Sequence, residues 1–296
     1  MPLGALIRGV VAAAALITLL HAAPSKSDED PVARGAYLAT AAGCANCHTD
    51  GAHGGKPYAG GLALGTPFGT FYSPNITPDP ETGIGRWTDA QFLRALREGV
   101  RADGANLFPV FPYTSYTLIL DEDARAIKAF LFSLPPVRQP NRSNDVSFPF
   151  SWRFLQNFWK LLFFEEGPFK PALDRSAAHN RGAYLVSALA HCGECHTPRN
   201  SLGGLDTDRF LAGAPPPGPD GKKAPNITPD RQTGIGDWSE DDIVGVLTDG
   251  RTPTFDEVGG PMAEVVKDTA QLTQEDRRAI AVYLRSVPPK KGSERK

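Results

Sequence analysis

Three blocks of this sequence occur twice and in the same order. The blocks are residues 34–49 and 181–197, residues 74–99 and 225–250, and residues 120–136 and 272–289. The middle block is identical at 13 of its 26 positions in the two copies. Such a recurrence indicates a tandem duplication, and 296 residues are enough for two copies that each bury a core. We therefore predict two domains of one fold, residues 31–136 and 177–289.

Each copy has the pattern of helices. The final block places apolar residues at three- and four-residue spacing before a pair of prolines: Ile127, Phe130, Leu131 and Leu134 in one copy, and Ile280, Tyr283, Leu284 and Val287 in the other. The middle block begins with Thr88 or Ser239, typical N-cap residues, and ends at Gly99 or Gly250, the usual C-terminal glycine. Strand alternation is scarce between these helices, so the sequence predicts an all-α fold.

The first 23 residues have the pattern of a secretory signal peptide. One Arg precedes an apolar run that ends at Leu20, small residues follow at Ala22 and Ala23, and a charged stretch comes next. His21 departs from the usual cleavage pattern, so an uncleaved N-terminal anchor is the alternative. No later segment has about 18 uninterrupted apolar residues. We expect a chain that is exported to the periplasm, with peripheral association with a membrane left open.

The charge composition argues against one class of partner. The chain has 31 basic and 33 acidic residues, with no long run of either sign. Proteins that bind nucleic acid concentrate Lys and Arg on one face. We therefore expect proteins or small molecules as partners, and no nucleic acid.

Each copy contains one Cys-x-x-Cys-His sequence, Cys44 to His48 and Cys192 to His196. This spacing is the attachment site of c-type haem, because two thiols can each add to a vinyl group while the following imidazole ligates the iron. The motifs use all the cysteines of the chain, namely Cys44, Cys47, Cys192 and Cys195. Zinc binding or disulfides would leave the two histidines without a role. The sequence predicts two covalently attached haem c groups, with His48 and His196 as iron ligands.

Met262 is the predicted second axial ligand of the second haem. Haem iron in cytochromes c takes methionine opposite histidine, which raises the potential. Met262 is the only methionine after the predicted signal peptide, and it lies in a Gly-Gly-Pro-Met turn. Residues 74–111 align with residues 225–262 without a gap, which places Phe111 at the same position in the first copy. Phenylalanine has no lone pair for iron.

The sixth ligand of the first haem is left open by the sequence. His53 follows His48 by five residues, and Tyr113 and Tyr116 flank the position of Phe111. Tyrosine and histidine can both ligate haem. Each candidate also has an ordinary interpretation, as a solvated loop histidine or a buried tyrosine. The favoured prediction is a first haem that is open or weakly ligated.

Residues 137–176 belong to neither copy and contain the aromatic run FSWRFLQNFWKLLFFEEGPF. One interpretation is a linker that packs between the domains. The other is a docking surface for a partner subunit or a membrane, because an exposed patch that includes Trp152, Phe158 and Trp159 would need a cover. Residues 290–296 form a polar tail.

Several motifs of this chain occur together in one known family. They are the two Cys-x-x-Cys-His motifs, the repeated Pro-Asn-Ile-Thr-Pro-Asp and Thr-Gly-Ile-Gly-x-Trp blocks and the Gly-Gly-Pro-Met-Ala-Glu turn. Together they resemble the multihaem cytochrome c subunit of bacterial membrane-associated alcohol, aldehyde and gluconate dehydrogenases. The likeness extends from about Pro31 to Pro289 and implies class I cytochrome c domains. Family members typically carry three haem domains and a Met in the first, whereas this chain stops after the second and has Phe111.

These observations predict a periplasmic dihaem cytochrome c that transfers electrons from a partner dehydrogenase to the respiratory chain, through a quinone, a small cytochrome or a terminal oxidase. On this hypothesis the chain is not itself an enzyme. A hypothesis of a different class is a haem enzyme that uses an open first haem for redox chemistry on peroxide or a small sulfur compound. The first hypothesis predicts no substrate turnover by the purified chain, and the second predicts turnover.

Overall fold

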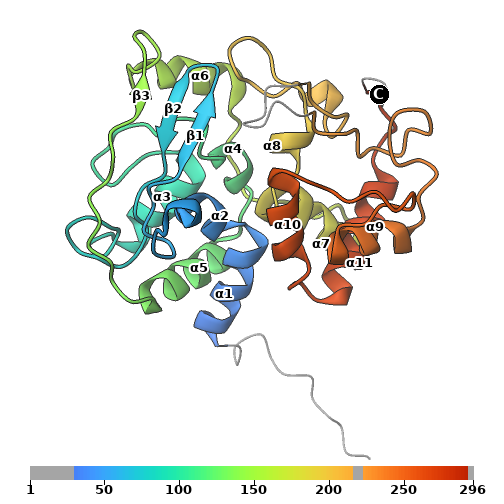
Figure 1. Ribbon diagram of the computed structural model, residues 1–296, viewed down its shortest axis with the longest axis horizontal. Helices are drawn as coiled ribbons and strands as arrows, with labels where there is room; N and C mark the ends of the chain where they lie inside the picture. The colour runs from blue at the N-terminus through green and yellow to red at the C-terminus, as the bar shows by residue number, and fades with distance from the viewer. Residues whose placement is uncertain (1–29, 216–222, 293–296) are drawn as a thin grey trace, which may run out of the picture.

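The computed structural model describes residues 30–215 and 223–292. The predicted signal peptide lies outside these ranges, as do the segment 216–222 and the end of the predicted tail. The described chain forms two groups of helices side by side, joined by a long connection (Figure 1). We refer to residues 30–136 as the first half and to residues 177–292 as the second half.

The helices of the first half are α1 (Pro31–Ala41), α2 (Cys44–His48), α3 (Asp89–Glu98), α4 (Tyr113–Tyr116) and α5 (Asp121–Ser133), with a 3₁₀ turn at Gly51–His53. α5 packs against α1 and α3. The expected caps of α3 are confirmed: the Thr88 hydroxyl accepts a hydrogen bond from the amide of Gln91 at 3.2 Å, and Gly99 ends the helix with a φ of 61°. This positive φ favours glycine.

The second half repeats this order. Its helices are α7 (Ala177–Tyr184), α8 (Gly193–His196), α9 (Glu240–Asp249), α10 (Pro261–Thr269) and α11 (Gln274–Ser286), with a π-helical turn at Leu185–Leu189 and a 3₁₀ turn at Thr207–Arg209. α11 packs against α7 and α9, as α5 packs against α1 and α3. Ser239 caps α9 and Gly250 ends it, as predicted. The duplication in sequence is therefore also a duplication in packing.

A glycine lets the first and last helices of each half cross closely. A β-carbon on Gly35 would lie 1.8 Å from the carbonyl oxygen of Ala126 in α5. One on Gly182 would lie 1.9 Å from the carbonyl oxygen of Ala279 in α11. Any side chain at these positions would push the two helices apart. The Arg-Gly-Ala-Tyr sequence, which occurs once in each half, thus needs its glycine for packing.

The second half has one residue more than the first between Arg-Gly-Ala-Tyr and Cys-x-x-Cys-His. The π-helical turn after α7 takes up this residue, because the amide of Ala190 bonds the carbonyl of Leu185, five residues back, at 2.8 Å. Each Cys-x-x-Cys-His motif therefore follows a residue with positive φ, Gly43 at 59° and His191 at 36°.

The structure adds one element that the all-α prediction lacks. Strands β1 (Ala63–Thr66) and β2 (Gly69–Tyr72) form a hairpin, and β3 (Asp145–Val146), from the connection, pairs with β2. Strands this short give too few alternating positions for a recognisable pattern. The sheet attaches the start of the connection to the first half.

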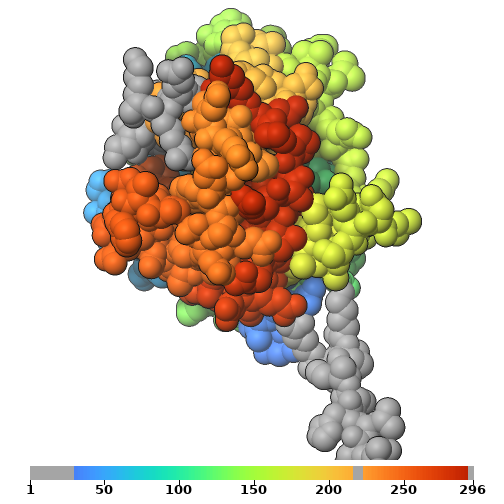
Figure 2. Space-filling model, turned by 90° about the vertical axis from the view of Figure 1, so that its right-hand side faces the viewer, coloured from blue at the N-terminus to red at the C-terminus, as the bar shows by residue number. Residues whose placement is uncertain are grey.

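The rest of the connection packs against both halves, which agrees with the first interpretation of its aromatic run. Its helix α6 (Leu155–Phe163) turns Trp159 inward, where the indole nitrogen donates to the carbonyl of Leu202 in the second half at 2.9 Å. The same ring meets Tyr113 of the first half, with centroids 6.2 Å apart. In Figure 2 the connection, in green to yellow-green, runs along the edge of the second half. α6 is therefore a bridge between the halves.

The opposite side of this segment is apolar and exposed. We call it the outer aromatic face, and it consists of Phe148, Phe150, Trp152, Phe154, Phe158, Leu161 and Leu162. Leu161 is 83% exposed and Phe158 is 55% exposed. Within the described residues, no helix is both long enough and apolar enough to cross a membrane.

Candidate functional site

The two Cys-x-x-Cys-His motifs form short helices, α2 and α8, directly after the first helix of each half. Residues three apart on a helix lie on the same face, so each turn presents its two thiols together. All four cysteines are free thiols, and Cys47 and Cys195 are exposed. Cys44 and Cys192 are partly buried against the apolar core. Burial raises the pKa of each of these two thiols to about 12, so they are uncharged at neutral pH.

The motif histidines are held in the same way in both halves. Nδ1 of His48 lies 2.7 Å from the carbonyl oxygen of Pro74, and Nδ1 of His196 lies 2.8 Å from that of Pro225. A carbonyl can only accept, so Nδ1 carries the proton and Nε2 keeps its lone pair. Histidines that bind metals are typically oriented by such a second bond. Both imidazoles are thus prepared to bind through Nε2.

Burial also favours the neutral form of these histidines. It lowers the pKa of His48 and of His196, and the hydrogen bonds with the proline carbonyls only partly oppose this effect. A neutral imidazole is the form that ligates a metal. The protonation state and the tautomer therefore both suit iron ligation.

The Pro-Asn-Ile-Thr turns position the proline carbonyls. The Asn75 side chain donates to the carbonyl of Val137 at 2.7 Å and accepts from the amide of Thr77 at 2.9 Å. Asn226 makes the equivalent bonds to Lys290 and Thr228, at 2.7 and 2.9 Å. The recurrence of these turns predicts that Asn75 and Asn226 hydrogen-bond on the proximal side of the haem or to a propionate. The structure adds that both side chains bond to backbone groups that hold the turns.

Both motifs lie at the boundary between the halves. Asn46, between the first pair of cysteines, donates to the Asp268 carboxylate of α10 at 2.6 Å. Glu194, between the second pair, accepts from the hydroxyl of Thr114 in α4 at 2.9 Å. Each motif thus contacts the other half.

Met262 and Phe111 lie in the segments that precede the final helix of each half. Met262 is half-buried in the first turn of α10, after Gly260, whose φ is 60°. Phe111 packs against the apolar core, and its ring lies 5.4 Å from that of Tyr116, measured between centroids. The structure therefore uses Phe111 as a packing residue.

Two of the other candidate ligands of the first site, His53 and Tyr116, make hydrogen bonds elsewhere, whereas the buried hydroxyl of Tyr113 has no hydrogen-bond partner among the described residues. The side chain of His53 is 82% exposed, and its Nδ1 lies 2.8 Å from the Asp50 carboxylate. The Tyr116 hydroxyl donates to the carbonyl of Ala42 at 3.0 Å. Tyr113 is fully buried, and burial raises the pKa of its phenol well above the usual value. The ordinary interpretations of these three residues agree with their surroundings.

The residues present fit a covalently bound haem in each half. Such a group needs two thiols on one face, a neutral histidine with a free Nε2, and apolar walls around a flat ring. Trp87 and Trp238 pack against the same apolar core as Cys44 and Cys192.

Comparison with known proteins gives an independent result. The sequence profile described as cytochrome c matches residues 32–135. A "Diheme cytochrome c-type" protein of Cereibacter sphaeroides is 44% identical, over 95% of this chain and 98% of that protein. The fructose dehydrogenase cytochrome subunit of Gluconobacter japonicus is 44% identical, over 90% of this chain and 54% of that subunit. The gluconate 2-dehydrogenase cytochrome c subunit of Pantoea cypripedii is 40% identical, over 98% of this chain and 66% of that subunit.

Proposed function

Because the chain belongs to the cytochrome c family, we propose that it is a periplasmic dihaem electron carrier between a catalytic dehydrogenase subunit and the respiratory chain. It carries two covalently attached haem c groups, and its relatives include cytochrome subunits of dehydrogenases rather than catalytic subunits. The finer proposal is that residues 31–136 and 177–289 are tandem class I cytochrome c domains. The observation that carries it is the matched pair of histidine–proline contacts, one in each half.

In this proposal the chain holds each haem through three residues. The attachment residues are Cys44, Cys47, Cys192 and Cys195, and the iron ligands are His48 and His196. When bound, the haem iron takes up and releases one electron at a time. The carbonyls of Pro74 and Pro225 keep each imidazole in one orientation with Nε2 free. Apolar packing around the motifs limits the access of water, which tunes the potential.

The two sites differ in their second axial ligand. Met262 supplies a thioether for the second haem, in agreement with its place before the final helix. Phe111, at the matching position of the first half, supplies none, so the first haem has an open or weakly held sixth position. The two haems consequently have different potentials, since axial ligands help to set haem potentials over about 0.8 V.

The names of the relatives support a dehydrogenase as the partner. Those of fructose and gluconate dehydrogenase are named as cytochrome subunits, so we assign this chain a catalytic dehydrogenase subunit as its electron donor. A quinone, a small cytochrome or a terminal oxidase is the acceptor. The segment 1–23 directs export, so the proposed location of the chain is the periplasm. There it would associate peripherally with the membrane together with its dehydrogenase donor.

Purification of the haem-loaded chain from its native membranes tests this function. We expect a catalytic dehydrogenase subunit to copurify and to reduce both haems when its substrate is added. The chain alone should oxidise no alcohol, aldehyde or sugar with an artificial acceptor. Steady turnover by the chain alone would contradict the carrier function.

Mass spectrometry after denaturation should show two added haems, falling to one in the variant Cys192→Ala/Cys195→Ala.

A further inference from the structure

We infer that a reciprocal pair of tyrosine–aspartate contacts locks the two halves together, and that Tyr37 and Tyr184 are positioning residues that fix the separation of the two haem-attachment motifs. This inference rests on the proposed electron-carrier function and adds a role for the Arg-Gly-Ala-Tyr sequence that occurs once in each half. In each half that sequence lies in the helix just before the haem-attachment motif, with Tyr37 seven residues before Cys44 and Tyr184 eight residues before Cys192.

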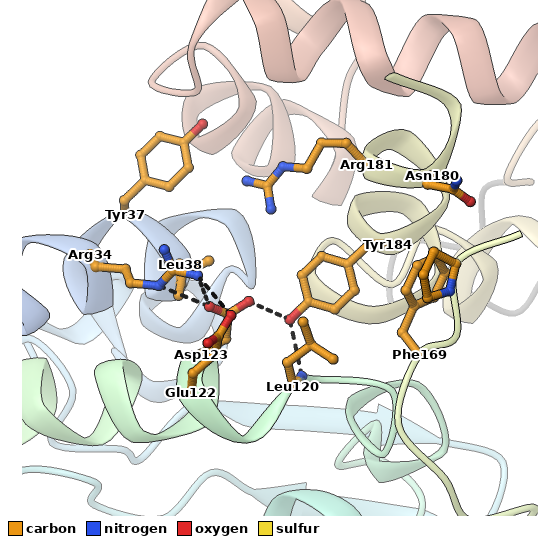
Figure 3. A pocket seen from close by; sticks show the side chains of 11 residues that line it. Arg34, Tyr37, Leu38, Leu120, Glu122, Asp123, Phe169, Asn180, Arg181 and Tyr184 are labelled. Carbon is orange, nitrogen blue, oxygen red and sulfur yellow. Dashed lines mark hydrogen bonds and ion pairs between the residues drawn. The ribbon is translucent and has the colours of Figure 1, made fainter. Parts of the chain in front are cut away.

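The first contact lies in a cavity of about 420 Å³ between the halves. Tyr184, from α7 of the second half, donates to the Asp123 carboxylate in the first turn of α5 at 2.6 Å. Its hydroxyl also accepts from the amide of Leu120, the N-cap residue of α5, at 3.2 Å. Arg34 of the first half bonds to the same carboxylate (Figure 3). Tyr184 thus satisfies both a carboxylate and a free amide at the start of a helix in the other half.

The second contact is the same with the halves exchanged. Tyr37, from α1 of the first half, donates to the Asp276 carboxylate in the first turn of α11 at 2.7 Å. Its hydroxyl accepts from the amide of Thr273, the N-cap residue of α11, at 3.1 Å. Arg181 of the second half donates to the same carboxylate at 2.6 and 2.7 Å. The Arg of each motif therefore binds within its own half, and the Tyr binds across the boundary.

Burial makes these contacts strong. Asp123 is 1% exposed and Asp276 is 7% exposed, and each carboxylate has an arginine from its own half and a tyrosine from the other. Removal of the Tyr184 hydroxyl would take a partner from Oδ2 of Asp123 and from the amide of Leu120. Removal of the Tyr37 hydroxyl would take one from the amide of Thr273, while Oδ2 of Asp276 keeps its bond from Arg181. The loss of a partner at a buried polar group costs more than the loss of an exposed contact. Two such contacts related by an approximate two-fold axis restrain rotation as well as separation.

The same interface brings the haem-attachment motifs together. Asn46 and Glu194 occupy the same position in the two motifs. Asn46 bonds to Asp268 in α10 of the second half, and Glu194 bonds to Thr114 in α4 of the first half. The ring of His191, the residue before Cys192, lies 5.4 Å from that of Tyr116 between centroids. The tyrosine contacts and the motif contacts thus cross the same boundary between the halves. Loss of the tyrosine contacts would therefore change the distance and orientation between the two haem-attachment motifs.

The test is the haem-loaded double variant Tyr37→Phe/Tyr184→Phe, which removes two oxygen atoms. We measure the rate at which an electron redistributes between the haems after partial reduction by a light-generated reductant. We also measure the magnetic dipolar coupling between the two ferric haems. We expect the redistribution rate to fall, because each charge-assisted hydrogen bond that is lost lowers the equilibrium constant for the docked arrangement by about ten-fold or more, and transfer between the haems is fast only in that arrangement. The dipolar coupling should weaken and broaden, with each haem's own spectrum unchanged.

Tyr72→Phe is the matched control, because Tyr72 lies in β2, away from the boundary, with its ring against Arg142. It should match the wild type in both measurements. A double variant with the wild-type rate and coupling would overturn the proposal. If the double variant does not accumulate, Tyr37→Phe alone is measured in the same way and decides between the same two results.

The result is separable from the carrier function. Light-generated reductant starts the redistribution without a dehydrogenase, so the effect of the two hydroxyls is measured even if no dehydrogenase reduces the chain. Failure of a dehydrogenase to reduce the wild type would count against the proposed function alone. An unchanged rate in the variant, together with normal reduction by the dehydrogenase, would count against the positioning role alone.

Discussion

Met262 and Phe111 occupy equivalent positions in the two halves but differ in what they can offer to a metal. A thioether has a lone pair, and a phenyl ring has none. The ring of Phe111 packs on Tyr116, whose hydroxyl is bonded to a backbone carbonyl. At this position the two candidate sites therefore differ in what they can offer to a metal.

We expect Met262→Ala to lower the potential of the second haem and Phe111→Met to raise that of the first, because methionine opposite histidine raises the potential.

The first haem of the wild type should bind added cyanide or imidazole faster than the second, and Phe111→Met should slow this binding. Spectroelectrochemical titration and stopped-flow binding measure both effects. A first haem that is low-spin and resistant to added ligands would contradict the open site, and loss of that state in His53→Ala would identify the ligand.

Asp276 links residue chemistry to the pH dependence of stability. Burial by itself raises the pKa of Asp276, but the hydrogen bonds from Arg181 and Tyr37 outweigh it, so its pKa in the folded protein lies below the ordinary value of 3.8. A carboxyl with a lowered folded pKa stabilises the fold above its unfolded pKa, and this contribution is lost as the pH falls through the folded pKa.

The wild type should therefore lose stability below about pH 4, and Asp276→Asn should remove part of that loss. At neutral pH the variant should be less stable by roughly 1.5–3 kcal/mol, the usual contribution of hydrogen bonds to a charged group. Thermal unfolding across the acidic range measures both effects. The exposed substitution Asp208→Asn is the control and should change neither. An identical acid profile for Asp276→Asn and the wild type would refute the assignment.

At the scale of elements, helix α6 has one face that packs against both halves and one face that is exposed. The inner face carries Trp159, which bonds to Leu202 of the second half and meets Tyr113 of the first. The outer aromatic face includes Phe158 and Leu161 and is exposed. The sequence treats the aromatic residues of this segment as one run, and only the helix decides which of them are buried.

This division predicts different effects of substitution on the two faces. Trp159→Ala should destabilise the protein by less than the roughly 3–5 kcal/mol of a fully buried tryptophan, because the ring is half-buried. Phe158→Ser should change stability by less than about 0.5 kcal/mol and should weaken copurification with the dehydrogenase subunit. Denaturant unfolding and copurification separate the two effects. Equal loss of stability in both variants would show that the outer face is also packed.

At the scale of the whole molecule, the near balance of charge bears on how a partner associates. The chain has a formal net charge of −2 at pH 7. Strong electrostatic steering requires a larger field of one sign. The exposed apolar surface is instead concentrated on the outer aromatic face. Association with a dehydrogenase should therefore depend mainly on apolar contact.

We expect the association rate with the dehydrogenase subunit to change less than about ten-fold over a range of salt in which steered complexes change far more. Stopped-flow measurement at low and high ionic strength tests this expectation, and Phe158→Ser serves as the variant with reduced apolar contact. A steep fall of the wild-type rate with salt would show that local charges, rather than the apolar face, guide the encounter.

Much of this molecule follows from local sequence. The repeated blocks predict the repeated helices, Thr88 and Gly99 mark the ends of α3, and Cys-x-x-Cys-His specifies its chemistry within five residues. These features depend on contacts between near neighbours along the chain, which is why a pattern can reveal them.

Only the tertiary structure decides the rest. The Tyr37 hydroxyl meets a carboxylate 239 residues away, and no periodicity encodes that pairing. The π-helical turn after α7 shows how one inserted residue is absorbed while the motif keeps its place. The short strands and the two faces of α6 depend on what packs against them. Local propensity and spacing thus determined the helices and the cofactor chemistry, whereas the relation between the halves depended on side chains brought together by folding, because such contacts leave no regular spacing in the sequence.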